Sequence, residues 1–139
     1  MKSLFSKRFH DQAMTQKEAV SVCESEQEVP AHLIEVDSQE ENQAIHNEDV
    51  RREKTCSGYK KTRYWMGIKK GPSGRDSDWV LESNGKSITF SNWLRLDWRN
   101  YACAVIQHTS GGAVWVSKGC GKSGNSAYTI YYTALCELD

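Results

Sequence analysis

The first part of the chain has the apolar periodicity of two amphipathic helices separated by a short apolar segment. "TQKE" (15–18) and "SQEE" (38–41) are capping boxes, in which the hydroxyl at the first position and the glutamate at the fourth each accept a hydrogen bond from a backbone amide. Apolar residues then recur at helical spacing. We therefore expect helices over about 15–26 and about 38–49, with 31–36 between them as a strand or a buried bridge.

From residue 63 onward the pattern changes to short β-rich runs, separated by turn-forming clusters of Gly, Ser, Asn and Pro. Two helices followed by several strands, without regular strand–helix alternation, argue for an α+β fold with an antiparallel sheet. The length fits one domain over residues 1–139, large enough to bury a core. The expected strands are 63–68, 78–82, 87–90, 102–107, 113–117 and 128–138.

Charge is balanced overall but unevenly placed. The 18 basic and 18 acidic residues give no net charge that would favour nucleic acid. Residues 24–49 hold nine acids and no Lys or Arg, whereas residues 51–75 hold nine Lys or Arg and one acid, Glu53. Two solvated faces account for this pattern. A basic patch for a polyanion is the alternative, and its candidate residues are Arg51, Arg52, Lys54, Lys60, Lys61 and Arg63.

The cysteines suggest a disulfide framework with one cysteine left over. Cys23, Cys56, Cys103, Cys120 and Cys136 have no C-x-x-C spacing, and the four histidines complete no zinc pattern. Disulfides imply an oxidising compartment, and hence a secreted protein or an extracellular domain of a larger one. No apolar run is long enough to insert into a membrane, and the charged segment 1–10 is not a signal peptide.

Several motifs, in this order, resemble the C-type lectin-like domain family over nearly the whole chain. "YWMGI" is similar to the family's W-I-G-L core segment, and "PAHLIEVDSQEEN" to its G-A-x-L-x-x-I-x-S-x-E-E segment, with Pro30 in place of Gly. The resemblance implies two helices packed on antiparallel sheets, a long-loop region, and the disulfides Cys23–Cys136 and Cys103–Cys120. Because "LFSKRF" carries no cysteine, the resemblance is either to the family's short form or to a longer form trimmed past its extra amino-terminal disulfide. The other matching motifs are "TQKEAVSVC", "ITFSNW", "CAVI", "VWVSKGC" and "ALCEL".

The calcium-binding motifs of the family's sugar binders are missing. Those proteins use E-P-N or Q-P-D, an acid shortly before the third framework cysteine, and W-N-D before the fourth. Here "WLRLDWRNYAC" (93–103) contains no such tripeptide, Tyr101 and Ala102 precede Cys103, and "WVS" (115–117) replaces W-N-D. Because Ca²⁺ requires six to eight oxygen ligands and Asp97 is the only carboxylate in the loop, we expect no metal or cofactor at this site.

The loop "LRLDWRNYA" is the first candidate contact surface. Trp, Tyr and Arg are the residues that most often anchor interfaces, and an aromatic plane can also stack on a sugar ring. Trp98 folding back to plug the shortened loop is the alternative, whereas Trp65, Trp79, Trp93 and Trp115 lie on or beside strand-like runs and are expected in the core. The candidate ligand-binding residues here are Arg95, Asp97, Trp98, Arg99, Asn100 and Tyr101.

Two further features have alternative interpretations. The polar, glycine-containing segment 119–129 is either a plain hairpin or a second binding loop that projects Lys118, Lys122 and Tyr128. Cys56, in a polar segment, is either an intermolecular disulfide partner that links a dimer, a free thiol, or the partner of a cysteine upstream of Met1.

The sequence contains no catalytic constellation, paired carboxylates in a cleft-like setting or cofactor fingerprint, so we expect no enzyme. The leading hypothesis is a non-catalytic extracellular recognition module that binds a protein or glycan without Ca²⁺ coordination. A protein ligand is favoured, because "DWRNY" offers anchors but few of the convergent polar groups that sugars need. The alternatives are a structural or oligomerising domain linked through Cys56, and a binder of sulfated polysaccharide through 51–75.

Overall fold

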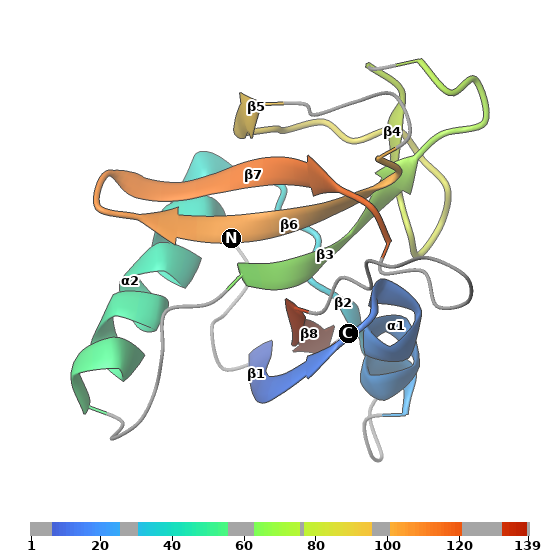
Figure 1. The fold of residues 1–139 in the computed structure, drawn as a ribbon. Coiled ribbons are helices and arrows are strands. Elements are labelled where there is room, and N and C mark those ends of the chain that lie inside the picture. The colour runs from blue at the N-terminus through green and yellow to red at the C-terminus, as the bar shows by residue number, and fades with distance from the viewer. Residues whose placement is uncertain are drawn as a thin grey trace.

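The computed structural model describes residues 7–25, 31–55, 63–75, 77–95, 101–120 and 132–138 (Figure 1). Within these residues neither helix is long and apolar enough to cross a membrane. The elements are β1 (Lys7–Met14), α1 (Gln16–Glu24), β2 (Ala31–Leu33), α2 (Gln39–Thr55), β3 (Arg63–Lys70), β4 (Trp79–Leu81), β5 (Trp93–Arg95), β6 (Cys103–Thr109), β7 (Gly112–Lys118) and β8 (Tyr132–Leu138).

Helix α1 begins at the first capping box, as the sequence predicts. The Glu18 amide donates to Thr15 Oγ1 over 3.2 Å, and the Thr15 amide donates to Glu18 Oε1 over 2.9 Å. The carboxylate at the positive end of the helix adds a favourable dipole interaction. Ala19 and Cys23, one turn apart, are buried and face the sheet.

Helix α2 is longer than its apolar pattern indicates. It continues to Thr55, beyond the expected end near residue 49. The extra turns carry ion pairs instead of an apolar stripe. The Glu48 carboxylate pairs with both Arg51 and Arg52, and the distance from Glu48 Oε1 to Arg52 Nε is 3.2 Å. Pairs at these spacings stabilise a solvated helix, and a search for apolar periodicity does not detect them.

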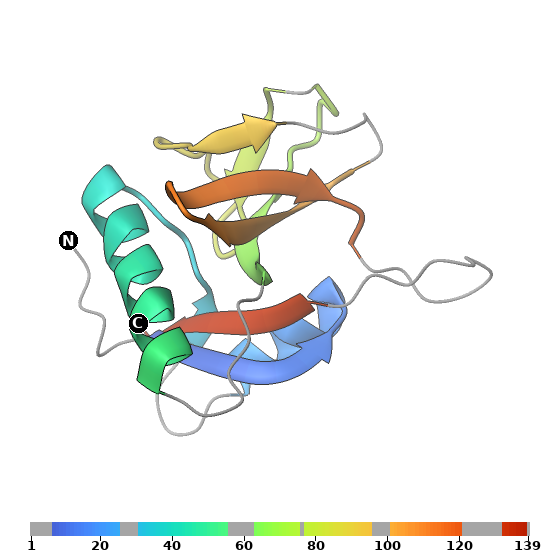
Figure 2. The ribbon, with the colours of Figure 1, turned by 60° about the vertical axis from the view of Figure 1, so that its left-hand side comes forward.

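The strands form one mixed sheet with the order β1-β8-β3-β6-β7-β5, to which β2 and β4 are attached through β8 and β3. Most neighbours are antiparallel, but β3 runs parallel to β8, and β5 runs parallel to β7. The expected α+β fold with two helices is confirmed, and the sheet is mixed, because these two pairs are parallel where antiparallel pairing was expected. The carboxy-terminal strand lies between β1 and β3, antiparallel to the first and parallel to the second (Figure 2).

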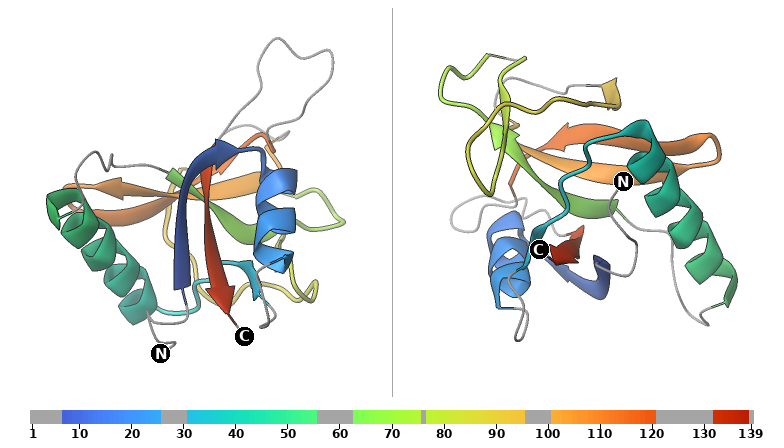
Figure 3. Two further views of the ribbon diagram at one scale, coloured as in Figure 1. Left: turned by 90° about the horizontal axis from the view of Figure 1, so that it is seen from below. Right: turned by 180° about the vertical axis from the view of Figure 1, so that it is seen from behind.

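Two strands were not expected from the sequence, and one expected strand is nearly absent. β1 and β5 have no marked apolar alternation and are the two edges of the sheet, where pairing comes from one neighbour only. Figure 3 shows β1 alongside β8 between the two helices. The expected strand 87–90 contains a single bridge, between Ser87 and Val80.

The two faces of the central strands bury two separate hydrophobic clusters. Along β3, Tyr64 and Met66 belong to the cluster under α2, and Trp65 belongs to the cluster that α1 covers. This division follows from the alternation of side chains along a strand. Trp65, Trp79 and Trp115 are buried as expected, and the fourth tryptophan of that group, Trp93, is partly buried against the first cluster.

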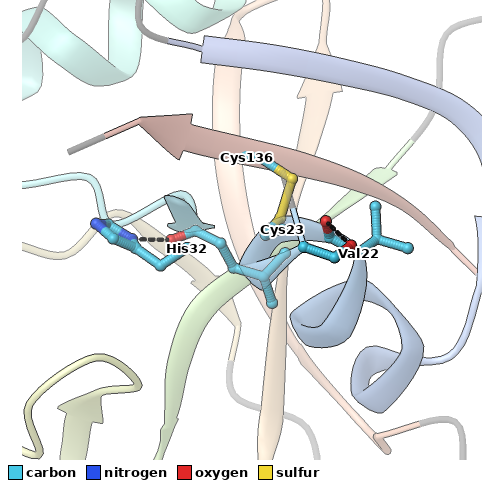
Figure 4. The surroundings of a disulfide bond; sticks show 6 residues. Val22, Cys23, His32 and Cys136 are labelled. Atoms are coloured by element: carbon cyan, nitrogen blue, oxygen red, sulfur yellow. Dashed lines mark hydrogen bonds between the residues drawn. A yellow bond between two sulfur atoms is a disulfide. The ribbon is translucent and has the colours of Figure 1, made fainter. Parts of the chain in front are cut away.

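Both disulfides implied by the family resemblance are present. Cys23–Cys136 joins α1 to β8 over a Cα–Cα distance of 5.3 Å (Figure 4). Cys103–Cys120 joins the start of β6 to the residues that follow β7, with Cα atoms 5.1 Å apart. The first bridge fixes the helix to the sheet, and the second fixes the end of the β6–β7 pair, where the candidate residues Tyr101 and Lys118 lie.

Candidate ligand-binding face

The β6–β7 hairpin is the frame of the candidate face. Its ladder is continuous from Cys103↔Lys118 to Thr109↔Gly112, and Cys103–Cys120 closes its open end. Gly112 has a φ of 134°, which an L side chain rarely adopts, so the tight turn at the other end requires glycine. The strands are therefore held at both ends.

The three residues at the W-N-D positions are buried in strand β7. Trp115, Val116 and Ser117 expose 0%, 2% and 1% of their surface. The Trp115 indole donates to Asn42 Oδ1 inside the protein, over 2.9 Å. Side chains buried in this way are packed within the sheet, where no ligand in solvent reaches them.

The two described residues directly before β6 carry no acidic side chain. Tyr101 and Ala102 are half-buried, and the Ala102 carbonyl accepts a hydrogen bond from the Lys70 amide over 3.0 Å. In the described part of the chain, no group of three or more His, Cys, Asp or Glu residues could hold a metal ion.

Strand β5 docks on β7 in a parallel arrangement. Trp93 pairs with Trp115, and Arg95 pairs with Val116. The residue just before β5 is also bonded to β7, because the Trp115 amide donates a hydrogen bond to the Asn92 carbonyl over 3.0 Å. Leu94 is 58% exposed, so this part of the face presents an apolar side chain to solvent.

The structure describes only part of the contact set predicted from the sequence. Tyr101 and Lys118 are half-buried and lie at the same end of the β6–β7 ladder, because Lys118 pairs with Cys103. The backbone of Arg95 lies in β5, beside Val116. The remaining candidates lie outside the described residues: Asp97, Trp98, Arg99, Asn100, Lys122, Tyr128 and Cys56.

A pocket that the sequence did not predict lies next to β5. Its volume is about 360 Å³, which is within the range of small-ligand sites. Trp79 at its base is buried, whereas Ile88, Phe90 and Trp93 are half-buried. We call it the aromatic pocket, and its described lining residues are Ser77, Trp79, Ile88, Thr89, Phe90, Ser91 and Trp93.

The walls of the aromatic pocket are held by ring contacts with the core. The Trp93 ring lies 4.8 Å from that of Trp79 and 5.6 Å from that of Trp115, and Phe90 meets Trp115 edge-on at 5.6 Å. A backbone hydrogen bond supports the same segment, since the Ile88 amide donates to the Trp79 carbonyl over 3.1 Å. The pocket is therefore formed before any ligand arrives.

The sequence contains a signal for this pocket. The sequence predicts a strand at 87–90, and in "ITFSNW" (88–93) polar residues separate Ile88, Phe90 and Trp93. In the structure the alternation has a different meaning: Ile88 and Phe90 pack against the core while Thr89 and Ser91 are exposed. Alternation indicates two environments on either side of an extended segment, and hydrogen bonding to a neighbour decides whether that segment is a strand.

The turn between β3 and β4 is organised by a carboxylate. Asp78 accepts hydrogen bonds from the hydroxyl and the amide of Ser73, over 2.6 and 3.0 Å. The hydrogen bond from the Ser73 hydroxyl, and to a smaller extent the one from the Ser73 amide, holds the pKa of the Asp78 carboxyl below its ordinary value. This turn leads directly into the Ser77 and Trp79 side of the pocket.

The described basic residues of 51–75 do not surround one point. Arg51 and Arg52 both bind Glu48, and the Arg51 hydrogen bond is the main reason that the pKa of Glu48 is lowered. Arg63 and Lys70 mark opposite ends of β3, roughly 23 Å apart at the usual rise per residue. The side chain of Lys54, and Lys60 and Lys61 entirely, lie outside the described residues.

Comparisons with known proteins agree on one fold. Residues 12–127 match the family model described as the lectin C-type domain. Among solved structures, C-type lectin CEL-I from Cucumaria echinata superposes with a TM-score of 0.70 at 19% identity, covering 96% of this chain and 89% of that one.

Two further solved structures have the same fold. The C-type lectin domain of murine dendritic cell inhibitory receptor 2, solved in complex with an N-glycan, has a TM-score of 0.67 at 17% identity and covers 97% and 92% of the two chains. A calcium-independent type II antifreeze protein has a TM-score of 0.66 at 14% identity, with coverage of 96% and 86%. No curated protein sequence matches the chain.

Proposed function

Because the chain belongs to the C-type lectin domain family, a non-catalytic family, we propose that it is an extracellular recognition module that binds a protein or glycan without coordinating it through Ca²⁺. Disulfide-bonded domains of this family are typical of extracellular proteins, and both bridges are present here. We further propose that the protein is secreted or is the extracellular part of a larger one, and that residues 1–139 form a single domain.

The observation that carries this proposal is the burial of the W-N-D positions. A Ca²⁺ site that also binds a ligand needs several oxygen-bearing side chains turned towards solvent. Trp115 and Val116 offer no side-chain oxygen, and the single hydroxyl of Ser117 is only 1% exposed. Tyr101 and Ala102, before Cys103, add no carboxylate. The residues at these positions do not supply the oxygen ligands that Ca²⁺ needs. We therefore assign ligand binding to direct contacts that involve no metal ion.

The contact surface in this proposal is the face around β5 and the disulfide end of β6–β7. Leu94, Tyr101 and Lys118 supply an exposed apolar group, an aromatic ring and a cation there. These are types found in interface cores and rims. The full proposed set remains Arg95, Asp97, Trp98, Arg99, Asn100, Tyr101, Lys118 and Lys122.

A ligand screen run under two conditions tests the proposal. The domain is applied to arrays of glycans and of extracellular protein domains, once with calcium and once with EDTA. We expect the same ligands to be retained in both. Ligands that are all lost in EDTA and recovered with calcium would overturn the proposal.

Trp98→Ala then separates the two interpretations of the loop. If Trp98 is an anchor, binding weakens by about 2–4 kcal/mol and the melting temperature stays near that of the wild type. If Trp98 plugs the loop, folding stability falls by about 3–5 kcal/mol. Arg99→Ala is the second loop variant, and Lys86→Ala, at an exposed cation in another turn, is its matched control. Unchanged stability and binding in both loop variants would remove this loop from the site.

A further inference from the structure

We propose that the aromatic pocket binds one neutral saccharide ring by stacking and hydrogen bonding, with no metal ion between protein and sugar. The inference rests on the proposed function, because it names the ligand class for one part of the recognition face. The pocket residues that carry the argument are all described.

The first argument is the rigid apolar wall. Trp93 and Phe90 line the pocket and are half-buried, and each also packs against the buried Trp115 at 5.6 Å. Trp115 is itself fixed by its bond to Asn42. A sugar ring has an apolar face formed by its C–H groups, which matches a flat aromatic surface. Because the walls are already ordered, binding requires little further loss of side-chain freedom.

The second argument is the hydroxyl rim. Ser77, Thr89 and Ser91 line the pocket and are exposed. No hydrogen bond to another described residue occupies their hydroxyls. Each hydroxyl is one donor and two acceptors, so each can exchange bonds with a hydroxyl of either orientation. Sugar hydroxyls are donors and acceptors of the same kind.

The third argument is the neutrality of the lining. None of the described residues that line the pocket is charged. Lys70 places its ammonium 5.9 Å from the centroid of the Trp79 ring without being part of the lining, and Trp79 itself is only 2% exposed. Among the described lining residues, a sulfated or carboxylated ligand would meet rings and hydroxyls but no cation. A neutral ring avoids that desolvation cost.

An apolar side chain from a protein is the competing occupant. It would use the walls formed by Ile88, Phe90 and Trp93, and it would gain nothing from the three hydroxyls around them. A saccharide ring uses both sets, which is why the observations favour it. The competing occupant is included as an arm of the experiment.

The test is an NMR titration of the whole domain in EDTA. The probes are methyl β-D-galactopyranoside, methyl α-D-mannopyranoside, methyl α-L-fucopyranoside and methyl N-acetyl-β-D-glucosaminide, with N-acetyl-leucinamide as the apolar competitor. We expect at least one glycoside to move the indole N–H signals of Trp79 and Trp93 saturably. Trp65 is the internal reference, because its indole is buried in the other cluster and donates to the Met14 carbonyl over 2.8 Å.

Variants separate stacking from hydrogen bonding. Thr89→Val and Ser91→Ala each remove one hydroxyl from an exposed position, and each should raise the dissociation constant about 2- to 10-fold. Phe90→Leu keeps an apolar group but removes the ring, and it should also weaken binding about 2- to 10-fold. Ser87→Ala is the matched control, because Ser87 is exposed on the same segment and does not line the pocket. A melting curve for each variant verifies that the fold is intact.

Three outcomes overturn the pocket assignment: no glycoside moves either pocket indole, the shifts persist unchanged in the Thr89→Val, Ser91→Ala double variant, or N-acetyl-leucinamide binds more tightly than every glycoside. None of these outcomes affects the proposed function, which fails separately if ligands on the arrays are lost in EDTA. The two hypotheses can therefore be rejected independently.

Discussion

The indole N–H of Trp115 donates a hydrogen bond to Asn42 Oδ1 over 2.9 Å, and this buried bond joins β7 to α2. The side-chain Nδ2 of Asn42 donates to the Ala113 carbonyl over 2.9 Å. The side-chain Nδ2 of Asn92, just before β5, donates to the same Ala113 carbonyl over 2.6 Å. One helix, one central strand and the approach to β5 are thus connected through buried polar groups. The aromatic pocket is built on this connection, since Trp115 supports two of its walls.

Asn42→Ala should lower the free energy of unfolding by about 1–3 kcal/mol, because the Trp115 indole then has no acceptor in the interior. The expected change is measured by urea denaturation followed by far-UV circular dichroism. Gln43→Ala is the control: its side chain is exposed and bonds only to Asn47 of the same helix. Equal stability losses in the two variants would contradict the role given to the buried bond.

Gly67→Ala should destabilise the fold by about 1–3 kcal/mol through overpacking. A Cβ at this position would lie 2.5 Å from the Leu33 carbonyl oxygen, which is backbone and cannot move aside easily. The Gly67 amide donates a hydrogen bond to the Ile34 carbonyl, and the Gly67 carbonyl accepts one from the Glu82 amide. A shift of Gly67 would therefore disturb both the core and the segment that leads to the pocket. Gly111→Ala meets nothing closer than 3.9 Å, and we expect a change within about 0.5 kcal/mol. Thermal melts of the two variants test this prediction, and equal stability losses in both would contradict it.

The two disulfides should differ in their effect on stability. Cys23–Cys136 spans 113 residues, and its removal by a double alanine substitution should cost about 4–5 kcal/mol in the chain-entropy model. Cys103–Cys120 spans 17 residues, and its removal should cost about 3 kcal/mol. Peptide mapping without reduction establishes the pairing first. A bridge from Cys56 to any of these four cysteines would be inconsistent with the fold.

The turn that leads into the pocket should loosen at acidic pH. Because the Ser73 hydroxyl and amide lower the pKa of Asp78 in the folded state, the contribution of Asp78 to stability is present above the unfolded-state pKa. It is lost as the pH falls through the lower, folded-state value. Carboxyl carbon NMR should show Asp78 titrating below its ordinary range, and Ser73→Ala should return it towards that range. Ser83→Ala, which removes a hydroxyl donor to Glu35 instead, should leave it unchanged.

Sequence reasoning succeeded where one local signal decides the structure. The capping box at Thr15 and Glu18 fixed the start of α1, and the apolar runs around Trp65 and Trp115 marked buried strands. The two disulfide pairs came from the family resemblance, since cysteine spacing alone leaves several pairings open.

The sequence was less informative where tertiary neighbours decide the structure. β1 and β5 are edge strands whose pairing comes from β8 and β7, and nothing in their own residues required it. The later turns of α2 depend on Glu48 binding two arginines. The aromatic pocket depends on Trp79 and Trp93, which are distant in sequence but have ring centroids 4.8 Å apart. The sequence predicts only that Trp79 and Trp93 are in the core, because it gives burial tendency and not which edge stays open.

A calcium titration by isothermal calorimetry tests the central claim, that recognition by this domain does not pass through Ca²⁺, most directly. Because residues 94–117 contain a single carboxylate, Asp97, and Ca²⁺ usually takes six to eight oxygen ligands, we expect no saturable site tighter than about 1 mM there. Asp97→Asn, which removes the only carboxylate of the loop, should give the same isotherm as the wild type. Saturable binding tighter than that limit, abolished by Asp97→Asn, would contradict the account.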